Sequence, residues 1–127
     1  MAALADAEPR PTLSLALARS FLGRRVTVHI DRPLGSRHPQ WGFLYRVNYG
    51  YVPGVIAPDG EELDAYVLGV DHPVTQYAGR CIAVVHRLDD DDDKLVVVPD
   101  GMCLSDDDIL AQTHFQEQFF DSHVLRA

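Results

Sequence analysis

The apolar residues of this 127-residue chain come in runs of strand length, and this limits the possible folds more than any other feature of the sequence. Five segments are rich in β-branched or aromatic residues, either alternating with polar ones or in short continuous runs, as strands in sheets are. They are residues 24–30, 45–52, 63–70, 81–87 and 94–100. No apolar run is long enough to span a membrane, so we expect no membrane segment. The pattern predicts a mainly β protein with five strands.

Two helical segments flank the predicted strands. Residues 12–23 are rich in leucine and alanine and end at Gly23, which is typical of a short helix. Ser105 precedes three aspartates, a pattern typical of an N-cap with an acidic first turn. Five short strands and a closing helix predict a single α+β domain over residues 1–127. We expect a small, closed or nearly closed barrel with helices packed outside it.

The charge and the cysteines exclude several classes of protein. A formal net charge of −8 argues against nucleic acid as a partner, because nucleic acid binding needs clustered lysine and arginine. A small anionic substrate remains possible if cations screen it. Cys81 and Cys103 have no metal-like spacing and imply no disulfide framework. The first residues have no basic region before their apolar stretch, so we expect a cytoplasmic protein without a secretory signal.

Three carboxylates crowd the start of the strand predicted at residues 63–70. Asp59, Glu61 and Asp64 lie within six positions of one another, and Gly60 falls among them. A solvated surface turn is one interpretation, since Asp-Gly between two strands is a common turn. A bend at Gly60 could instead aim the three carboxylates at one point, where their oxygens would suit Mg2+. The residues alone leave both interpretations open.

A second acidic segment precedes the last predicted strand. Five aspartates, residues 89–93, lead into Lys94, which is the only lysine in a chain with ten arginines. A charge run is typical of a solvated loop, and we favour that interpretation for residues 89–91. Asp92 and Lys94 are two positions apart at the start of a strand, so their side chains should point the same way. A carboxylate for a metal beside an ammonium for a phosphate oxygen suits phosphoryl chemistry.

Three segments resemble the soluble inorganic pyrophosphatases, a family with an oligonucleotide-binding-like (OB-like) barrel. The segment YRVNYGYVPG is similar to that family's Y-P-x-N-Y-G-Y motif, DGEELD to its D-x-D-P-x-D signature, and DDKLVVVP to its D-x-K strand opening. The motifs occur in the family's order and cover roughly residues 26–100. The resemblance implies a five-stranded OB-like barrel, hydrolysis of inorganic diphosphate with Mg2+ as cofactor, and a homo-oligomer.

The resemblance also implies a role for each matching residue. Metal ligands would be Asp59, Asp64 and Asp92, with Asp89 or Asp90 as a further acidic ligand. Glu61 would orient the attacking water, and Tyr49 and Lys94 would contact phosphate. The implied catalytic residues are therefore Glu61, Asp64, Lys94 and Tyr49.

The chain also departs from the family's pattern. Residues 32–42 replace a hairpin that carries phosphate-binding Lys, Glu and Arg, and Phe119 and Phe120 stand where the family has a Tyr-Lys pair. Because some cation must replace the lost contacts, we expect Arg32 and Arg37 to bind substrate. The departures leave two alternatives open: hydrolysis of another small phosphoanhydride, and a non-catalytic barrel that binds a metal or a nucleotide.

Overall fold

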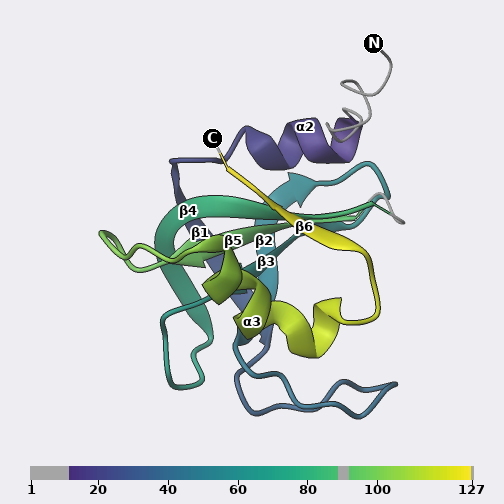
Figure 1. The fold of residues 1–127 in the computed structure, drawn as a ribbon, viewed down its shortest axis with the longest axis vertical. Coiled ribbons are helices and arrows are strands. Elements are labelled where there is room, and N and C mark those ends of the chain that lie inside the picture. Colours follow the sequence, from purple (N-terminus) through teal and green to yellow (C-terminus); the bar gives the residue numbers. More distant parts are fainter. Residues whose placement is uncertain (1–11, 89–91, 127) are drawn as a thin grey trace.

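The computed structural model describes residues 12–88 and 92–126 (Figure 1). The elements in chain order are α2 (Leu13–Arg19), β1 (Arg25–Arg32), β2 (Asn48–Ile56), β3 (Glu62–Val67), β4 (Gln76–Arg87), β5 (Asp93–Val98), α3 (Asp106–Glu117) and β6 (Ser122–Leu125). None of the helices in the described part of the chain is long and apolar enough to cross a membrane.

Strands β1 to β5 close into a barrel. Their order is β1-β2-β3-β5-β4, and a further pairing between β1 and β4 completes the ring. All neighbours are antiparallel except β3 and β5, which run parallel. This arrangement confirms the predicted five-stranded barrel with flanking helices.

The strand β6 was not predicted. It is four residues long and pairs with the end of β4, whose beginning pairs with β1 on the same edge. The sequence Ser-His-Val-Leu is too short and too polar to show a strand period. The helix after Ser105 is confirmed, and Ser105 and Asp108 form a reciprocal capping box at its start.

The predicted strand at residues 45–52 begins later than expected, at Asn48. Tyr45 exchanges backbone hydrogen bonds with the preceding segment instead: its N–H donates to Ser36 at 2.8 Å, and its carbonyl accepts from Gly35 at 2.8 Å. Residues 33–47 therefore fold back on themselves, and we call them the 33–47 loop. This loop projects beside the barrel at the bottom of Figure 1.

The fold has two apolar cores, one on each face of the sheet. The barrel interior holds residues from all five strands, and α2 adds Leu15 and Ala18 to it. The second core lies outside the barrel, between the sheet and α3, and includes Tyr66 and Ile109. All six residues of β5 are buried because the strand contributes to both cores, which explains its continuous apolar run.

A buried carboxylate joins α3 to the barrel. Glu117 accepts hydrogen bonds from Arg87 Nε at 2.9 Å, Arg87 Nη2 at 2.8 Å, Tyr66 Oη at 2.5 Å and Ser122 Oγ at 2.6 Å. Burial alone would raise the pKa of Glu117, but the hydrogen bonds from Arg87, Ser122 and Tyr66 outweigh burial and hold the pKa below its usual value. The end of α3 is therefore fixed to β3, β4 and the start of β6.

Replacing Gly50 by alanine should destabilise the fold by about 3 kcal/mol or more. A Cβ at residue 50 would lie 1.8 Å from the carbonyl oxygen of His29, a backbone atom that cannot turn away. Gly60→Ala is the matched control: its φ is +87° with nothing within 4 Å, so strain should cost about 1 kcal/mol. Urea unfolding of both variants measures the difference. Equal stability of the two variants would contradict the close approach of β1 and β2.

Glu117→Gln should lose about 3 kcal/mol of stability at neutral pH, because it removes the buried counter-charge of Arg87 and leaves only its ion pair with the partly exposed Asp92. The folded state lowers the pKa of Glu117, so its stabilisation is complete above the ordinary pKa of 4.5 and is lost as the pH falls through the folded value. The gap between wild type and variant should therefore shrink at acidic pH.

Chemical unfolding of wild type and Glu117→Gln, measured from neutral to acidic pH, tests this prediction. Glu62→Gln is the control, because Glu62 is only half-buried and, within the described residues, its carboxylate accepts a hydrogen bond from Gly54 N–H alone. We expect the control to stay within about 0.5 kcal/mol of wild type throughout. A gap for Glu117→Gln that does not change with pH would contradict an ionised Glu117.

Candidate active site

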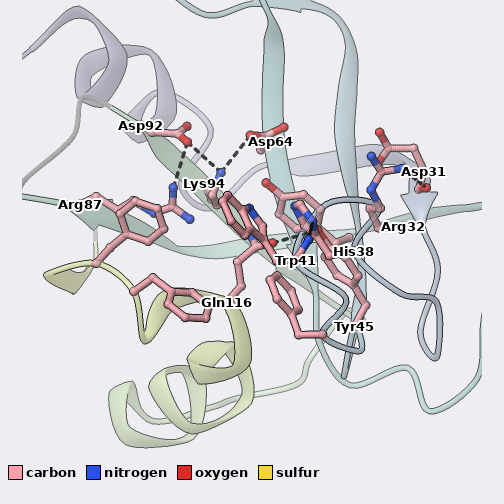
Figure 2. Close-up of a pocket in the computed structure, with 14 residues that line it drawn as sticks. Asp31, Arg32, His38, Trp41, Tyr45, Asp64, Arg87, Asp92, Lys94 and Gln116 are labelled. Atoms are coloured by element: carbon pink, nitrogen blue, oxygen red, sulfur yellow. Dashed lines mark hydrogen bonds and ion pairs between the residues drawn. The ribbon is translucent and has the colours of Figure 1, made fainter.

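A cavity of about 800 Å³ lies between the outer face of the barrel, the 33–47 loop and the end of α3. Residues from β1, β2, β3, β4 and β5 reach into it, together with side chains of the loop and the residues around the end of α3. Figure 2 shows that Asp64, Asp92 and Lys94 gather at one end in this view, and Asp31 and Arg32 at the other. We call this cavity the central pocket.

Lys94 sits between two carboxylates of the central pocket. Its Nζ lies 2.9 Å from Asp64 Oδ2 and 3.1 Å from Asp92 Oδ2. The parallel register pairs Ala65 with Leu95, and this places Asp64 next to Lys94 on the same face of the sheet. Asp92 and Lys94 point the same way, as their spacing predicts. Two neighbouring strands therefore assemble the acid-base-acid group.

The two neighbouring carboxylates favour the charged form of Lys94. The Lys94 side chain is only 3% exposed, so burial alone would lower its pKa, but Asp64 and Asp92 outweigh burial and raise it. Burial raises the pKa of Tyr49 well above its usual value, and the charges of Asp64 and Asp92 add to the rise. The Tyr49 phenol therefore keeps its proton at neutral pH, and Lys94 Nζ lies 5.3 Å from its ring centroid.

Arg87 extends the charged group toward α3. Its Nη1 donates to Asp92 Oδ2 at 3.1 Å, while Nε and Nη2 bind Glu117. Its guanidinium also lies 3.7 Å from the ring centroid of Phe120. Three carboxylates and two cations, counted over Asp64, Asp92, Glu117, Arg87 and Lys94, leave a formal charge of −1. This end of the pocket favours a further cation.

The opposite end carries Arg32 beside the phenol of Tyr45. Burial raises the pKa of Tyr45, and Arg32 partly offsets that rise. Arg32 Nη1 donates to the carbonyl of Asp31 at 3.3 Å, and the guanidinium also interacts with the Tyr45 side chain. Among the described residues, no carboxylate forms an ion pair with Arg32, so its charge is available to a ligand.

The central pocket contains five of the predicted site residues. They are Arg32, Tyr49, Asp64, Asp92 and Lys94. Arg37 lies outside its lining, where Nη1 donates to the carbonyl of Gly42 at 3.0 Å. Asp89 falls outside the residues that the structure describes.

The structure does not gather Asp59, Glu61 and Asp64 at one point. Asp59 and Glu61 lie in an exposed turn, where Asp59 Oδ1 accepts from the backbone N–H of Glu61 at 2.9 Å. This short-range bond stabilises the turn and directs the Asp59 carboxylate to its own backbone. Only Asp64, which already belongs to β3, reaches the central pocket.

The carboxylates of the pocket can supply only some of the ligands that Mg2+ needs. No three or more acidic, histidine or cysteine side chains form a group that could hold a metal ion in the part of the chain described. An all-protein metal cage is therefore not present there. Asp64 and Asp92 are 36% and 31% exposed, and their ion pairs use only Oδ2. They suit a Mg2+ ion that keeps several waters and is also bound by substrate phosphates.

Sequence reasoning missed several residues of the central pocket. Arg87 and Gln116 look like ordinary strand and helix residues, and their neighbours on other elements are invisible in the sequence. Trp41 lies in a loop without a repeating pattern. Trp41 is the only tryptophan of the chain, which was the one available signal.

Comparison with known proteins identifies the family. A family model described as inorganic pyrophosphatase matches residues 27–123. No curated protein matches the chain. Among solved structures, the chain is similar to the inorganic pyrophosphatase of Ehrlichia chaffeensis, with a TM-score of 0.66 and 19% identity over 83% of this chain and 87% of that one.

Two further structures have the same fold. The inorganic pyrophosphatase of Coxiella burnetii gives a TM-score of 0.57 at 23% identity, over 79% of this chain and 83% of that one. That of Thermus thermophilus gives 0.54 at 19% identity, over 81% and 80%. These identities establish the fold alone, whereas the family model covers most of the chain and includes all three motifs. The chain belongs to the inorganic pyrophosphatase family, as its motifs predict.

Proposed function

We propose that the chain hydrolyses inorganic diphosphate to two phosphates in the central pocket, with Mg2+ as cofactor. One observation carries the proposal: Lys94 is held between Asp64 and Asp92 in a pocket of a chain that belongs to the inorganic pyrophosphatase family. A buried cation beside two partly exposed carboxylates can bind an anion and a divalent metal next to each other.

Asp64 and Asp92 would hold Mg2+ together with the phosphate oxygens. A bound Mg2+ would neutralise phosphate charge and lower the pKa of a coordinated water. The two carboxylates would also attract the metal ion itself, because their end of the pocket is formally negative. Removing either one should weaken metal binding more than it weakens the fold.

Lys94 and Tyr49 would bind the phosphoryl groups. The ammonium supplies a fixed charge, and the protonated Tyr49 phenol donates a hydrogen bond. The oxygen of a water molecule attacks one phosphorus, and the bond from that phosphorus to the bridging oxygen breaks. The bridging oxygen leaves with the second phosphate, where a cation such as Arg32 would stabilise its charge.

The other implied roles stay proposals. Asp59 would serve a second metal ion and Glu61 would orient the water, in an arrangement that the substrate complex has to assemble. Asp89 would be a further acidic ligand, and Arg37 a further phosphate contact. We also propose that the protein is a cytoplasmic homo-oligomer, and sedimentation velocity tests the assembly.

A non-catalytic barrel that binds phosphate compounds is the rival function. It is favoured by the lack of a three-ligand metal group among the described residues. Phosphate release from inorganic diphosphate, measured with and without Mg2+, separates a catalyst from a binder.

Asp64→Asn should abolish Mg2+-dependent phosphate release and leave the fold intact. The substitution removes a charge for the metal but keeps the shape of the side chain. The buried Lys94 keeps its ion pair with Asp92, so the loss of its pair with the partly exposed Asp64 should cost little stability. Phosphate release and thermal melting with and without Mg2+ make the test. Asp71→Asn is the control, because its side chain is fully exposed and outside the pocket. Full activity in folded Asp64→Asn would end the proposed metal role.

Lys94→Ala should lower kcat/KM for inorganic diphosphate by about thirtyfold, on the order of 2 kcal/mol, because the pocket loses its most deeply buried cation. Lys94→Arg should also be impaired, since a planar guanidinium cannot replace a compact ammonium between two carboxylates. Steady-state kinetics of both variants test this role. Wild-type kinetics in both would mean that Lys94 only balances the charge of Asp64 and Asp92.

A further inference from the structure

A row of aromatic side chains lines the central pocket, and no step of diphosphate hydrolysis uses it. His38, Trp41 and Phe43 come from the 33–47 loop, and Phe119 follows α3. Ring centroids are 6.3 Å apart for His38 and Trp41, 4.9 Å for His38 and Phe43, and 6.0 Å for Phe43 and Phe119. We call these four residues the aromatic wall. It joins the loop to the end of α3 along one side of the pocket.

Two members of the aromatic wall are left largely in water. Trp41 is 72% exposed and Phe119 is 62% exposed, although both line the pocket. Large aromatic side chains grouped at a pocket and exposed to solvent are typical of a surface that a ligand covers. Phe120 differs, because the guanidinium of Arg87 already covers its ring. Trp41 and Phe119 therefore offer free ring faces to a ligand.

Inorganic diphosphate would occupy only part of this pocket. A cavity of about 800 Å³ lies within the range of pockets that enclose a whole organic ligand. Inorganic diphosphate consists of two phosphoryl groups and has no apolar surface to cover the aromatic wall. Most of the pocket would stay filled with water around it.

The charges of the pocket do not separate the two kinds of diphosphate. The carboxylates that line it are Asp31, Asp64 and Asp92, and the cations are Arg32, Arg87 and Lys94. These charges balance, so either diphosphate would depend on Mg2+ for further positive charge. A substrate that also carries an apolar, planar group would gain affinity by stacking on the aromatic wall.

We propose that the pocket takes a nucleoside diphosphate, whose base stacks on the aromatic wall and whose phosphates lie at Lys94. This inference rests on the proposed hydrolysis of inorganic diphosphate in the central pocket and extends it to a further substrate class. The oxygen of water would attack the β-phosphorus, and the bond from that phosphorus to the bridging oxygen would break. The bridging oxygen would leave with the nucleoside monophosphate. One proton of the water would stay on the released phosphate, and the other would pass to solvent. In the view of Figure 2, Trp41 lies between Lys94 and Tyr45.

Steady-state kinetics on two substrates test the proposal. Phosphate release from ADP and from inorganic diphosphate is measured with Mg2+ for wild type, Trp41→Ala, Phe119→Ala and Trp41→Phe. We expect wild type to give a higher kcat/KM for ADP than for inorganic diphosphate. The ratio of the two values should fall about tenfold in each alanine variant and be largely restored in Trp41→Phe, because a ring that stacks is retained. Leu13→Ala, an exposed residue of α2 outside the pocket, should leave the ratio unchanged.

The single tryptophan gives a second readout that does not depend on turnover. Trp41 fluorescence is the signal, because the chain has no other tryptophan. The α,β-methylene analogue of ADP, which cannot be hydrolysed, should change this fluorescence in a saturable way. Ribose 5-phosphate, which carries a phosphate but no base, should not, and neither should inorganic diphosphate.

The outcomes separate this inference from the proposed function. Release of phosphate from inorganic diphosphate but not from ADP, with no fluorescence change, overturns the substrate class and leaves the proposed function standing. A Trp41→Ala variant that loses both activities in equal proportion overturns the role of the wall in recognising a base. No release from either compound in a folded wild-type protein overturns both.

Discussion

The position of β5 between β3 and β4 is the constraint on which both the fold and the site depend. Its parallel pairing with β3 and antiparallel pairing with β4 complete the barrel, and its two faces supply both apolar cores. The same register sets Lys94 beside Asp64 at the end of the apolar run. A change of register by one residue would turn Lys94 into the barrel interior. Burial of the valines in β5 therefore also fixes the geometry of the charged group.

Charge balance links this group to α3. Arg87 binds both Glu117, which holds α3 against the barrel, and Asp92, which faces the central pocket. Burying these charges is unfavourable unless each has a partner, and the hydrogen bonds of Glu117 and Lys94 provide those partners. The pocket is therefore organised before any ligand binds. The helix and the charged group depend on the same buried arginine.

The chain combines a barrel of the pyrophosphatase family with an aromatic pocket wall. The family match and the solved structures agree on the fold, and the carboxylates at Asp64 and Asp92 fit the metal chemistry proposed for it. The aromatic rings of the wall come from the 33–47 loop and from the end of α3 instead. The proposed base-binding residues and the strands that close the barrel therefore lie in different parts of the chain.

The sequence by itself determined the local features of this protein. The alternation at Val26 and Val28 and the apolar run after Lys94 are strand periods, Ser105 is a helix cap, and the i, i+2 spacing of Asp92 and Lys94 decides that they share a face. Each depends only on residues close in the chain, and the family motifs added the barrel and the enzyme class. Only the tertiary structure decided which distant groups meet. It separates Asp59 and Glu61 from the pocket because a local bond holds the Asp59 carboxylate in its own turn. It brings Arg87 to Glu117, and Trp41 to the same pocket as Lys94, because strand pairing and helix packing set those distances. No pattern of neighbouring residues carries that information.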